Sequence, residues 1–145
     1  MKNFKSPLLV ILQLAALFYI FITGARIPSD PIILAMLLIG AFLGLWAFYA
    51  LRMTKFSILP EVPVNAALVT AGPYKIVRHP LYTSLMIIGI SLVLNDPTIP
   101  RVIALVVLLG VLFIKTEAEE KYLNAHFKEY GAYQAQTQKL IPFLY

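Results

Sequence analysis

Long apolar runs with short polar interruptions dominate the chain, and four of them are candidate membrane segments. Residues 7–24 and 31–51 are each long enough, as a helix, to cross a hydrocarbon core about 30 Å thick. Residues 81–94 and 99–114 are shorter, and a break with two prolines separates them. This short pair either spans the bilayer with distortion or forms a re-entrant hairpin, and both arrangements return the chain to the same side.

After the last apolar run, the pattern changes to that of an amphipathic helix from residue 116 to about residue 133. At 100° per residue, Glu119 falls on the apolar side, with Lys115 one turn before it, and Glu120 falls at the edge. An ordinary ion pair between Lys115 and Glu119 is the simplest interpretation. A carboxylate on a buried face usually needs a specific partner, which is either a base elsewhere in the protein or a positively charged ligand.

Composition assigns the chain to the membrane proteins. Its 145 residues are 60% hydrophobic and 13% charged, with a mean hydropathy of +0.81, which is outside the range of soluble domains. The length predicts one domain over residues 1–145. We therefore expect an all-α, multi-pass membrane helical bundle. The absence of cysteine excludes disulfides and thiolate sites, and the two histidines lack metal-ligand spacing, so we expect no metal.

The distribution of basic residues predicts the orientation. Of the 12 Lys and Arg, ten lie in the N-terminus, the 52–80 loop and the tail, and two lie in the other connections. By the positive-inside rule, both termini are cytoplasmic, at the inner membrane if the source is bacterial. The net charge of +5 forms no basic stripe with interleaved aromatics, so we expect no nucleic-acid partner. We interpret the first run as a helix because it is long and no clear signal-peptide cleavage site follows.

Polar residues with chemical potential gather where the 52–80 loop enters the third run. His79 precedes a proline and is biased towards an extended backbone, and Pro80 suits the first position of a helix. The free N–H groups of that helix and the charge of Arg78 form a candidate site for a carboxylate or phosphate. The alternative is that Arg78 and Lys75 only extend towards lipid headgroups and fix topology.

Small and hydroxyl residues in the apolar runs favour packing over chemistry. Ser84 and Ser91 have no nearby base, so we interpret them as packing residues rather than nucleophiles. Gly40 and Gly44 are spaced for close approach of two helices.

Several of these segments together resemble the isoprenylcysteine carboxyl methyltransferase family, with which phospholipid N-methyltransferases share much of the pattern. The resemblance runs from about Thr54 to the C-terminus. The segments that carry it are Leu68-Val69-Thr70, Gly72-Pro73-Tyr74, Arg78-His79-Pro80-Leu81-Tyr82, Glu119-Glu120 with Leu123 and Phe127, and Ile141-Pro142-Phe143. The combination of Arg-His-Pro-x-Tyr with a downstream Glu-Glu is specific, whereas neither half is specific alone.

The resemblance implies a membrane enzyme that uses S-adenosyl-L-methionine in a cytosol-facing pocket. The methyl group would go to a lipid-like or small apolar acceptor at oxygen, nitrogen or sulfur. Lys115 stands where the family typically has an arginine facing the substrate, and with Arg78 it is a candidate catalytic residue. The residues implied to line the cofactor site are Ala67, Leu68, Val69, Tyr74, His79, Pro80, Leu81, Tyr82 and Glu119.

Three positions depart from the family pattern. Lysine at position 115 lacks the planar, two-pronged guanidinium that suits a carboxylate, so the resemblance does not fix a prenylcysteine carboxylate as the acceptor. Ser84 and Lys128 replace common glycines and indicate local packing changes.

Three other interpretations of the function remain open on sequence grounds. A sterol-type membrane reductase would use a reduced nicotinamide cofactor, but the chain is short for that larger bundle. A small transporter usually carries ionisable residues near the bilayer midplane, and the first three runs carry none. A purely structural membrane subunit would leave the polar segments unexplained.

Overall fold

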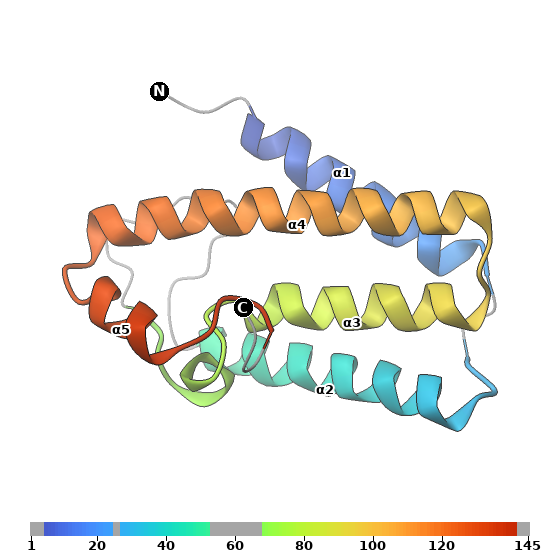
Figure 1. The fold of residues 1–145 in the computed structure, drawn as a ribbon, viewed down its shortest axis with the longest axis horizontal. Coiled ribbons are helices and arrows are strands. Elements are labelled where there is room, and N and C mark those ends of the chain that lie inside the picture. The colour runs from blue at the N-terminus through green and yellow to red at the C-terminus, as the bar shows by residue number, and fades with distance from the viewer. Residues whose placement is uncertain (1–4, 25–26, 53–67, 142–145) are drawn as a thin grey trace.

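The fold, taken from a computed structural model, is all-α, as the sequence predicts. The structure describes residues 5–24, 27–52 and 68–141, and within them it contains five α-helices and one 3-10 turn. In Figure 1, three long helices run side by side and the first crosses them obliquely, with its N-terminal end standing away from the rest. The elements are α1 (Lys5–Ile22), α2 (Pro31–Arg52), η1 (Gly72–Lys75), α3 (Pro80–Asn95), α4 (Ile99–His126) and α5 (Tyr130–Gln136).

Close packing of α2 against α3 depends on small residues. A Cβ at Gly40 would lie 3.0 Å from side-chain atoms of Ile87 and Ile88, and one at Gly44 would lie 2.5 Å from the Ser84 hydroxyl. The Ser84 hydroxyl donates a 2.7 Å hydrogen bond to the Gly40 carbonyl. The packing roles predicted for these glycines and for Ser84 are therefore confirmed.

A second helix–helix contact joins α1 to α4. Ala16 and Ile20 of α1 are buried in one apolar cluster with Leu108 and Leu112 of α4. Their spacing of four residues on each helix places them on one face. Away from these two helix–helix contacts, large apolar side chains are exposed, such as Leu45, which has 71% of its surface exposed. An apolar surface that covers a whole bundle is unfavourable in water, whereas contact with lipid is favourable for it.

The lengths and hydropathies of the helices agree with a membrane protein. Pro31–Arg52 and Ile99–His126 are long and apolar enough to cross a bilayer, whereas Pro7–Ile22 and Pro80–Asn95 are shorter apolar helices. On these criteria two crossings are supported, and the count of four predicted from the sequence stays a prediction.

The tail differs from its prediction. The fourth apolar run and the predicted amphipathic helix 116–133 are not separate, because α4 continues without interruption to His126. The chain then leaves the helix at Phe127, which has an extended backbone (φ −115°, ψ 114°), and α5 begins at Tyr130. No proline or glycine lies between residues 111 and 126, and good helix formers carry the helix past the apolar run.

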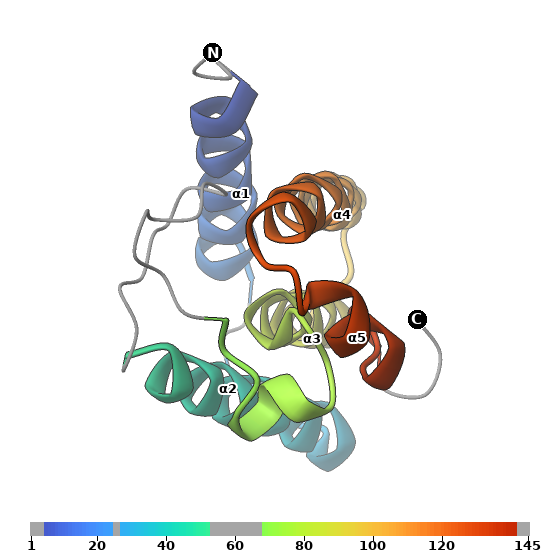
Figure 2. The same cartoon turned by 90° about the vertical axis from the view of Figure 1, so that its left-hand side faces the viewer.

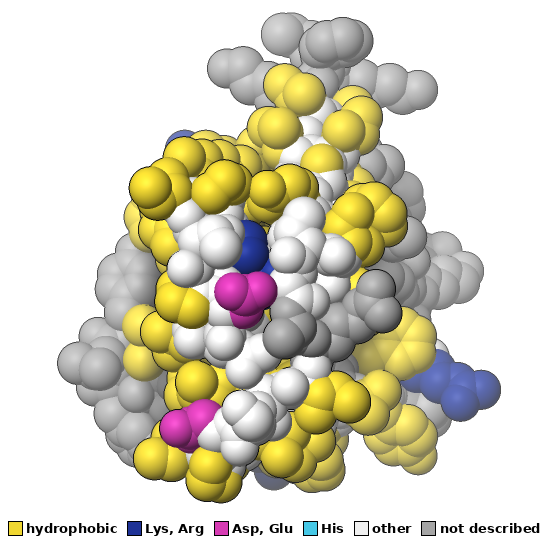
Figure 3. All heavy atoms as spheres, turned by 90° about the vertical axis from the view of Figure 1, so that its right-hand side faces the viewer, with side chains coloured by type: hydrophobic (Ala, Val, Ile, Leu, Met, Phe, Trp, Pro, Cys, Tyr) yellow, Lys and Arg dark blue, Asp and Glu magenta, His cyan; other side chains and the backbone are white. Residues whose placement is uncertain are grey.

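At the end of the bundle where the α1–α2 and α3–α4 connections lie, hydrophobic side chains surround a central area of backbone and uncharged side chains, with few charged ones (Figure 3). Arg101 is buried there, with 1% of its surface exposed. Its guanidinium donates to the carbonyls of Ile20 (3.0 Å) and Leu92 (2.5 Å) and to the Thr23 hydroxyl (3.3 Å). Arg101 thus binds the C-terminal turns of α1 and α3 together.

Candidate active site

The candidate site lies at the other end of the bundle, which faces the viewer in Figure 2. There the start of α3, the last turns of α4, η1 and α5 come together. Pro80 is the first residue of α3, and His79 before it caps the helix with a non-helical backbone. The position of Pro80 follows the prediction. The backbone of His79 (φ −125°, ψ 59°) is not extended, so that part of the prediction is wrong.

Glu120 is the centre of an ionic cluster. One carboxylate oxygen lies 2.8 Å from Arg78 Nε and 3.4 Å from His79 Nε2. The other lies 3.2 Å from Gln134 Nε2 and 3.5 Å from Lys139 Nζ. Both lone-pair regions of this carboxylate are therefore engaged by protein groups, as a buried charge requires.

Glu119 has a different environment. It accepts a hydrogen bond from the Tyr82 hydroxyl, and its second oxygen lies 3.3 Å from His79 Nδ1. Its side chain is 24% exposed, against 10% for Glu120. The helical wheel placed Glu119 on the apolar side and Glu120 at the edge, and this order is wrong. Packing of α5 and the C-terminal segment over α4 buries Glu120, which a wheel for α4 alone does not include.

His79 joins the two glutamates. Its ring is buried between them and stacks at 5.8 Å on the ring of Tyr82. Burial lowers the pKa of His79, but hydrogen bonds to Glu119 and Glu120 and their charges outweigh burial and raise the pKa above its ordinary 6.5. The imidazolium form is thus favoured between two carboxylates.

This raised pKa leads to a pH dependence of stability. The stabilisation from protonated His79 is fully present below about pH 6.5 and is lost as pH rises through the raised pKa. We expect the midpoint of thermal unfolding to fall over this range in the wild type and to fall less in His79→Gln. Parallel curves for the two proteins across pH 5.5 to 9, followed by intrinsic fluorescence, would contradict this assignment.

Arg78 joins neighbouring elements of the protein through its side chain. Besides Glu120, its Nη1 donates to the carbonyls of Gln134 (3.2 Å) and Thr137 at the end of α5. A cation at the C-terminus of a helix satisfies carbonyls that have no partner within the helix. These contacts engage Nε and Nη1 of Arg78 with protein groups. The anion site predicted at Arg78 stays a prediction.

A C-terminal segment (residues 137–141, called the strap below) completes this end of the bundle. It pairs with the loop before α3 through a parallel bridge between Val77 and Gln138. Backbone bonds join Arg78 N to Gln138 O (2.8 Å) and His79 N to Lys139 O (3.2 Å). The strap therefore holds the backbone of the Arg78-His79 pair in place.

Lys115 is buried on α4, one helical turn before Glu119. Its Nζ donates to Gln13 Oε1 of α1 at 2.7 Å and lies 5.1 Å from the centre of the Tyr82 ring. Among the ion pairs that the structure shows within its described residues, none joins Lys115 to Glu119. The predicted i,i+4 pair is therefore not formed, because the lysine side chain turns towards α1 instead.

The remaining predicted lining residues differ in burial, and one of them lies outside the described residues. Tyr74 of η1 is buried, and its carbonyl accepts a 2.6 Å hydrogen bond from the Tyr133 hydroxyl. Burial, with the nearby charge of Glu119, raises the pKa of the Tyr74 hydroxyl. Pro80 is buried, and Leu68, Val69 and Leu81 are partly buried. Ala67 lies outside the described residues.

Sequence reasoning missed Gln13, Gln134 and Lys139 as members of this site. Gln13 had a signal, because it is the only amide side chain in the first apolar run. Gln134 and Lys139 had none, because their contacts depend on how α5 and the strap fold back over α4.

The fold and this cluster define a helical membrane protein with a polar site at one end of its bundle. Residues 32–130 match the phospholipid methyltransferase family over most of the chain. The chain belongs to this family, and the resemblance seen in the sequence is confirmed. It is therefore, in general terms, a membrane methyltransferase.

One curated relative is named for metal resistance. The cobalt-zinc-cadmium resistance protein CzcN of Cupriavidus metallidurans is 35% identical over 83 residues, which are 55% of this chain and 38% of the relative. The chain thus spans well under half the length of that protein. Within the described residues, no group of three or more His, Asp or Glu side chains is arranged to hold a metal ion.

Proposed function

We propose that this chain is an integral membrane methyltransferase that uses S-adenosyl-L-methionine bound at the cytosolic face. The acceptor is lipid-like or small and apolar, and it takes the methyl group at oxygen, nitrogen or sulfur. The proposal rests on the different contacts and exposure of the two adjacent glutamates. Glu120 is engaged by four protein groups, whereas Glu119 stays partly exposed beside Tyr82 and His79.

The donor set of this site fits the cofactor. S-adenosyl-L-methionine supplies a methyl group on a cationic sulfonium, and it also carries an ammonium and a carboxylate. Glu119 offers a carboxylate to the cationic groups, and Tyr82 orients that carboxylate through its hydroxyl. The first N–H groups of α3 are the proposed partners of the anionic group. For a direct displacement, these residues can catalyse the reaction by aligning the two reactants and excluding water from them.

The other predicted residues receive roles within this proposal. Tyr74, Leu68, Val69, Pro80 and Leu81 are proposed to line the cofactor site, with Ala67 included from the sequence alone. Lys115 is proposed to face the acceptor. For Arg78 the contacts support an indirect role, in which it fixes Glu120 and the end of α5 so that Glu119 and His79 are held in position.

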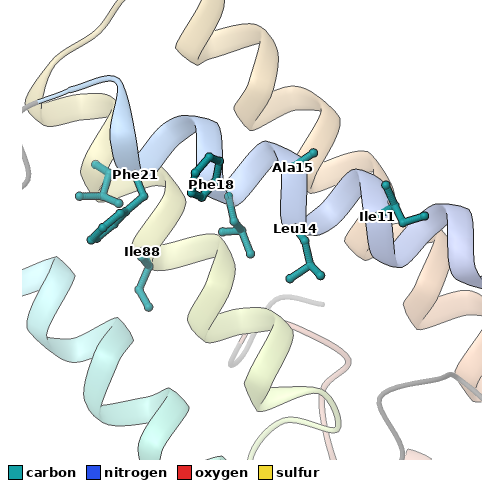
Figure 4. A pocket seen from close by; sticks show the side chains of 8 residues that line it. Ile11, Leu14, Ala15, Phe18, Phe21 and Ile88 are labelled. Atoms are coloured by element: carbon teal, nitrogen blue, oxygen red, sulfur yellow. The ribbon is translucent and has the colours of Figure 1, made fainter.

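An apolar groove supports an acceptor that arrives through the bilayer. The groove has a volume of about 710 Å³ and lies between α1 and α3 (Figure 4). Leu14 and Phe18 of α1 and Ile88 of α3 are among the side chains that line it. Among the described residues that line the groove, none is charged. The same helix, α1, carries the Gln13 side chain that contacts Lys115.

Binding of S-adenosyl-L-methionine to the purified protein tests this proposal. We expect saturable binding by calorimetry that a reduced nicotinamide cofactor does not displace. Tritiated methyl groups should then pass from the cofactor into a host lipid extract. Absence of binding, or displacement by the nicotinamide, would refute the proposed function.

We expect Glu119→Gln to weaken cofactor binding roughly tenfold or more, because a charge-assisted hydrogen bond contributes about 1.5–3 kcal/mol. Calorimetric titration in detergent measures the change. Glu129→Gln, which alters an exposed glutamate that takes part in none of the ion pairs shown within the described residues, is the control. An unchanged dissociation constant in Glu119→Gln would leave Glu119 with a structural role only.

Four membrane segments and cytoplasmic termini are also part of the proposal. Reporter fusions after Tyr145 and at Asp96 are expected to report opposite sides if α3 and α4 both span. A reporter at the C-terminus that is active only outside the cytoplasm would contradict the cytosolic position of the site.

A further inference from the structure

The partners of Lys115 are unusual for a buried cation. Only 3% of the residue's surface is exposed. Its ammonium group contacts a neutral amide, Gln13, and the face of an aromatic ring, Tyr82. A charged group in an apolar bundle is costly unless specific partners hold it. The direction of this ammonium therefore depends on Gln13, which supplies the one side-chain oxygen shown bonded to it within the described residues.

Gln13 reaches Lys115 from a helix that lies outside the family match, which begins at residue 32. Gln13, Ala16 and Ile20 have the spacing of one helical face. Ala16 and Ile20 are buried in the cluster that includes α4, and Gln13 continues this face by one turn towards the site. α1 thus brings a polar side chain to the end of the bundle that holds the candidate site.

We propose that Gln13 is a positioning residue for Lys115. Its side-chain oxygen holds the ammonium group against Tyr82, on the side of the site where the acceptor's reacting atom arrives. Without this oxygen, the lysine side chain has other rotamers available and its charge is no longer fixed relative to Glu119. This inference rests on the proposed function and assigns α1 a part in it.

Two substitutions separate positioning from packing. Gln13→Met keeps the length of the side chain but removes the oxygen, whereas Gln13→Glu keeps an oxygen that accepts from Lys115. We expect Gln13→Met to lower the single-turnover rate of methyl transfer roughly tenfold or more, with the dissociation constant of S-adenosyl-L-methionine unchanged. Gln13→Glu should retain most of the rate. Leu8→Met, at an exposed position of α1, is the control.

A measurement without cofactor tests the contact itself. Gln13→Met should lower the midpoint of thermal unfolding of the ligand-free protein in the wild-type background, and should lower it much less in a Lys115→Met background. Equal shifts in the two backgrounds would overturn the proposal, and so would a wild-type transfer rate in Gln13→Met. In either case the proposed function would stand if the wild type transfers methyl groups. Failure of the wild type to bind S-adenosyl-L-methionine would overturn both.

Discussion

Replacing Glu120 by alanine is expected to destabilise the protein by about 3–5 kcal/mol, the usual cost of removing one partner from a buried ionic group. The substitution leaves Arg78 and Lys139 without their shared carboxylate and removes one of the two charges that flank His79. Because Arg78 also holds the end of α5, the strap should loosen along with the cluster. Chemical denaturation in mixed micelles, compared with wild type, measures this loss.

The neighbouring glutamates supply matched comparisons for this prediction. Glu119→Ala should be less destabilising than Glu120→Ala, because Glu119 is more exposed and contacts only Tyr82 and His79 among the bonds shown. Glu117→Ala, at a side chain 41% exposed, should have the smallest effect. Limited proteolysis of the tail should follow the same order. An equal loss for Glu119→Ala and Glu120→Ala would show that Glu120 is not the centre of the cluster.

The helices could be predicted from sequence because their signals are local. Apolar runs, Pro80 at a helix start and the small residues Gly40 and Gly44 each act within a few turns of helix, and the structure places each of them as predicted. The amphipathic helix predicted from residue 116 to about residue 133 differs from the structure, in which α4 continues to His126 and α5 begins at Tyr130. A change from apolar to amphipathic composition marks a change of environment, but it does not stop a helix whose residues all favour helix.

The sequence pointed to part of the ionic cluster but not to how its members pair. The family pattern brings Arg78, His79 and the two glutamates to attention, and these residues do meet. Which glutamate is buried depends on the strap, which lies about twenty residues further along the chain. The contact between Gln13 and Lys115 joins residues 102 positions apart. No helical wheel or spacing rule contains such contacts, because only the packing of whole helices creates them.

The final prediction concerns the end of the bundle opposite the site. Arg101→Met should destabilise the protein by about 2–6 kcal/mol, because the Ile20 and Leu92 carbonyls lose a charged donor, at about 1–3 kcal/mol for each buried group left unsatisfied. Below the unfolding transition, affinity for S-adenosyl-L-methionine should not change, since Arg101 lies at the other end of α4 from Glu119.

Gly24 provides the internal test of this assignment. A Cβ at that position would lie 1.9 Å from Arg101 Nη1, so Gly24→Ala forces the guanidinium away from the carbonyls that it binds. Once Arg101 is methionine, the same Cβ meets no guanidinium, and Gly24→Ala should cost much less. The two substitutions are therefore expected to be clearly less than additive in denaturation experiments. Additive losses would mean that Gly24 acts through its own backbone, and that the arginine does not join the ends of α1 and α3.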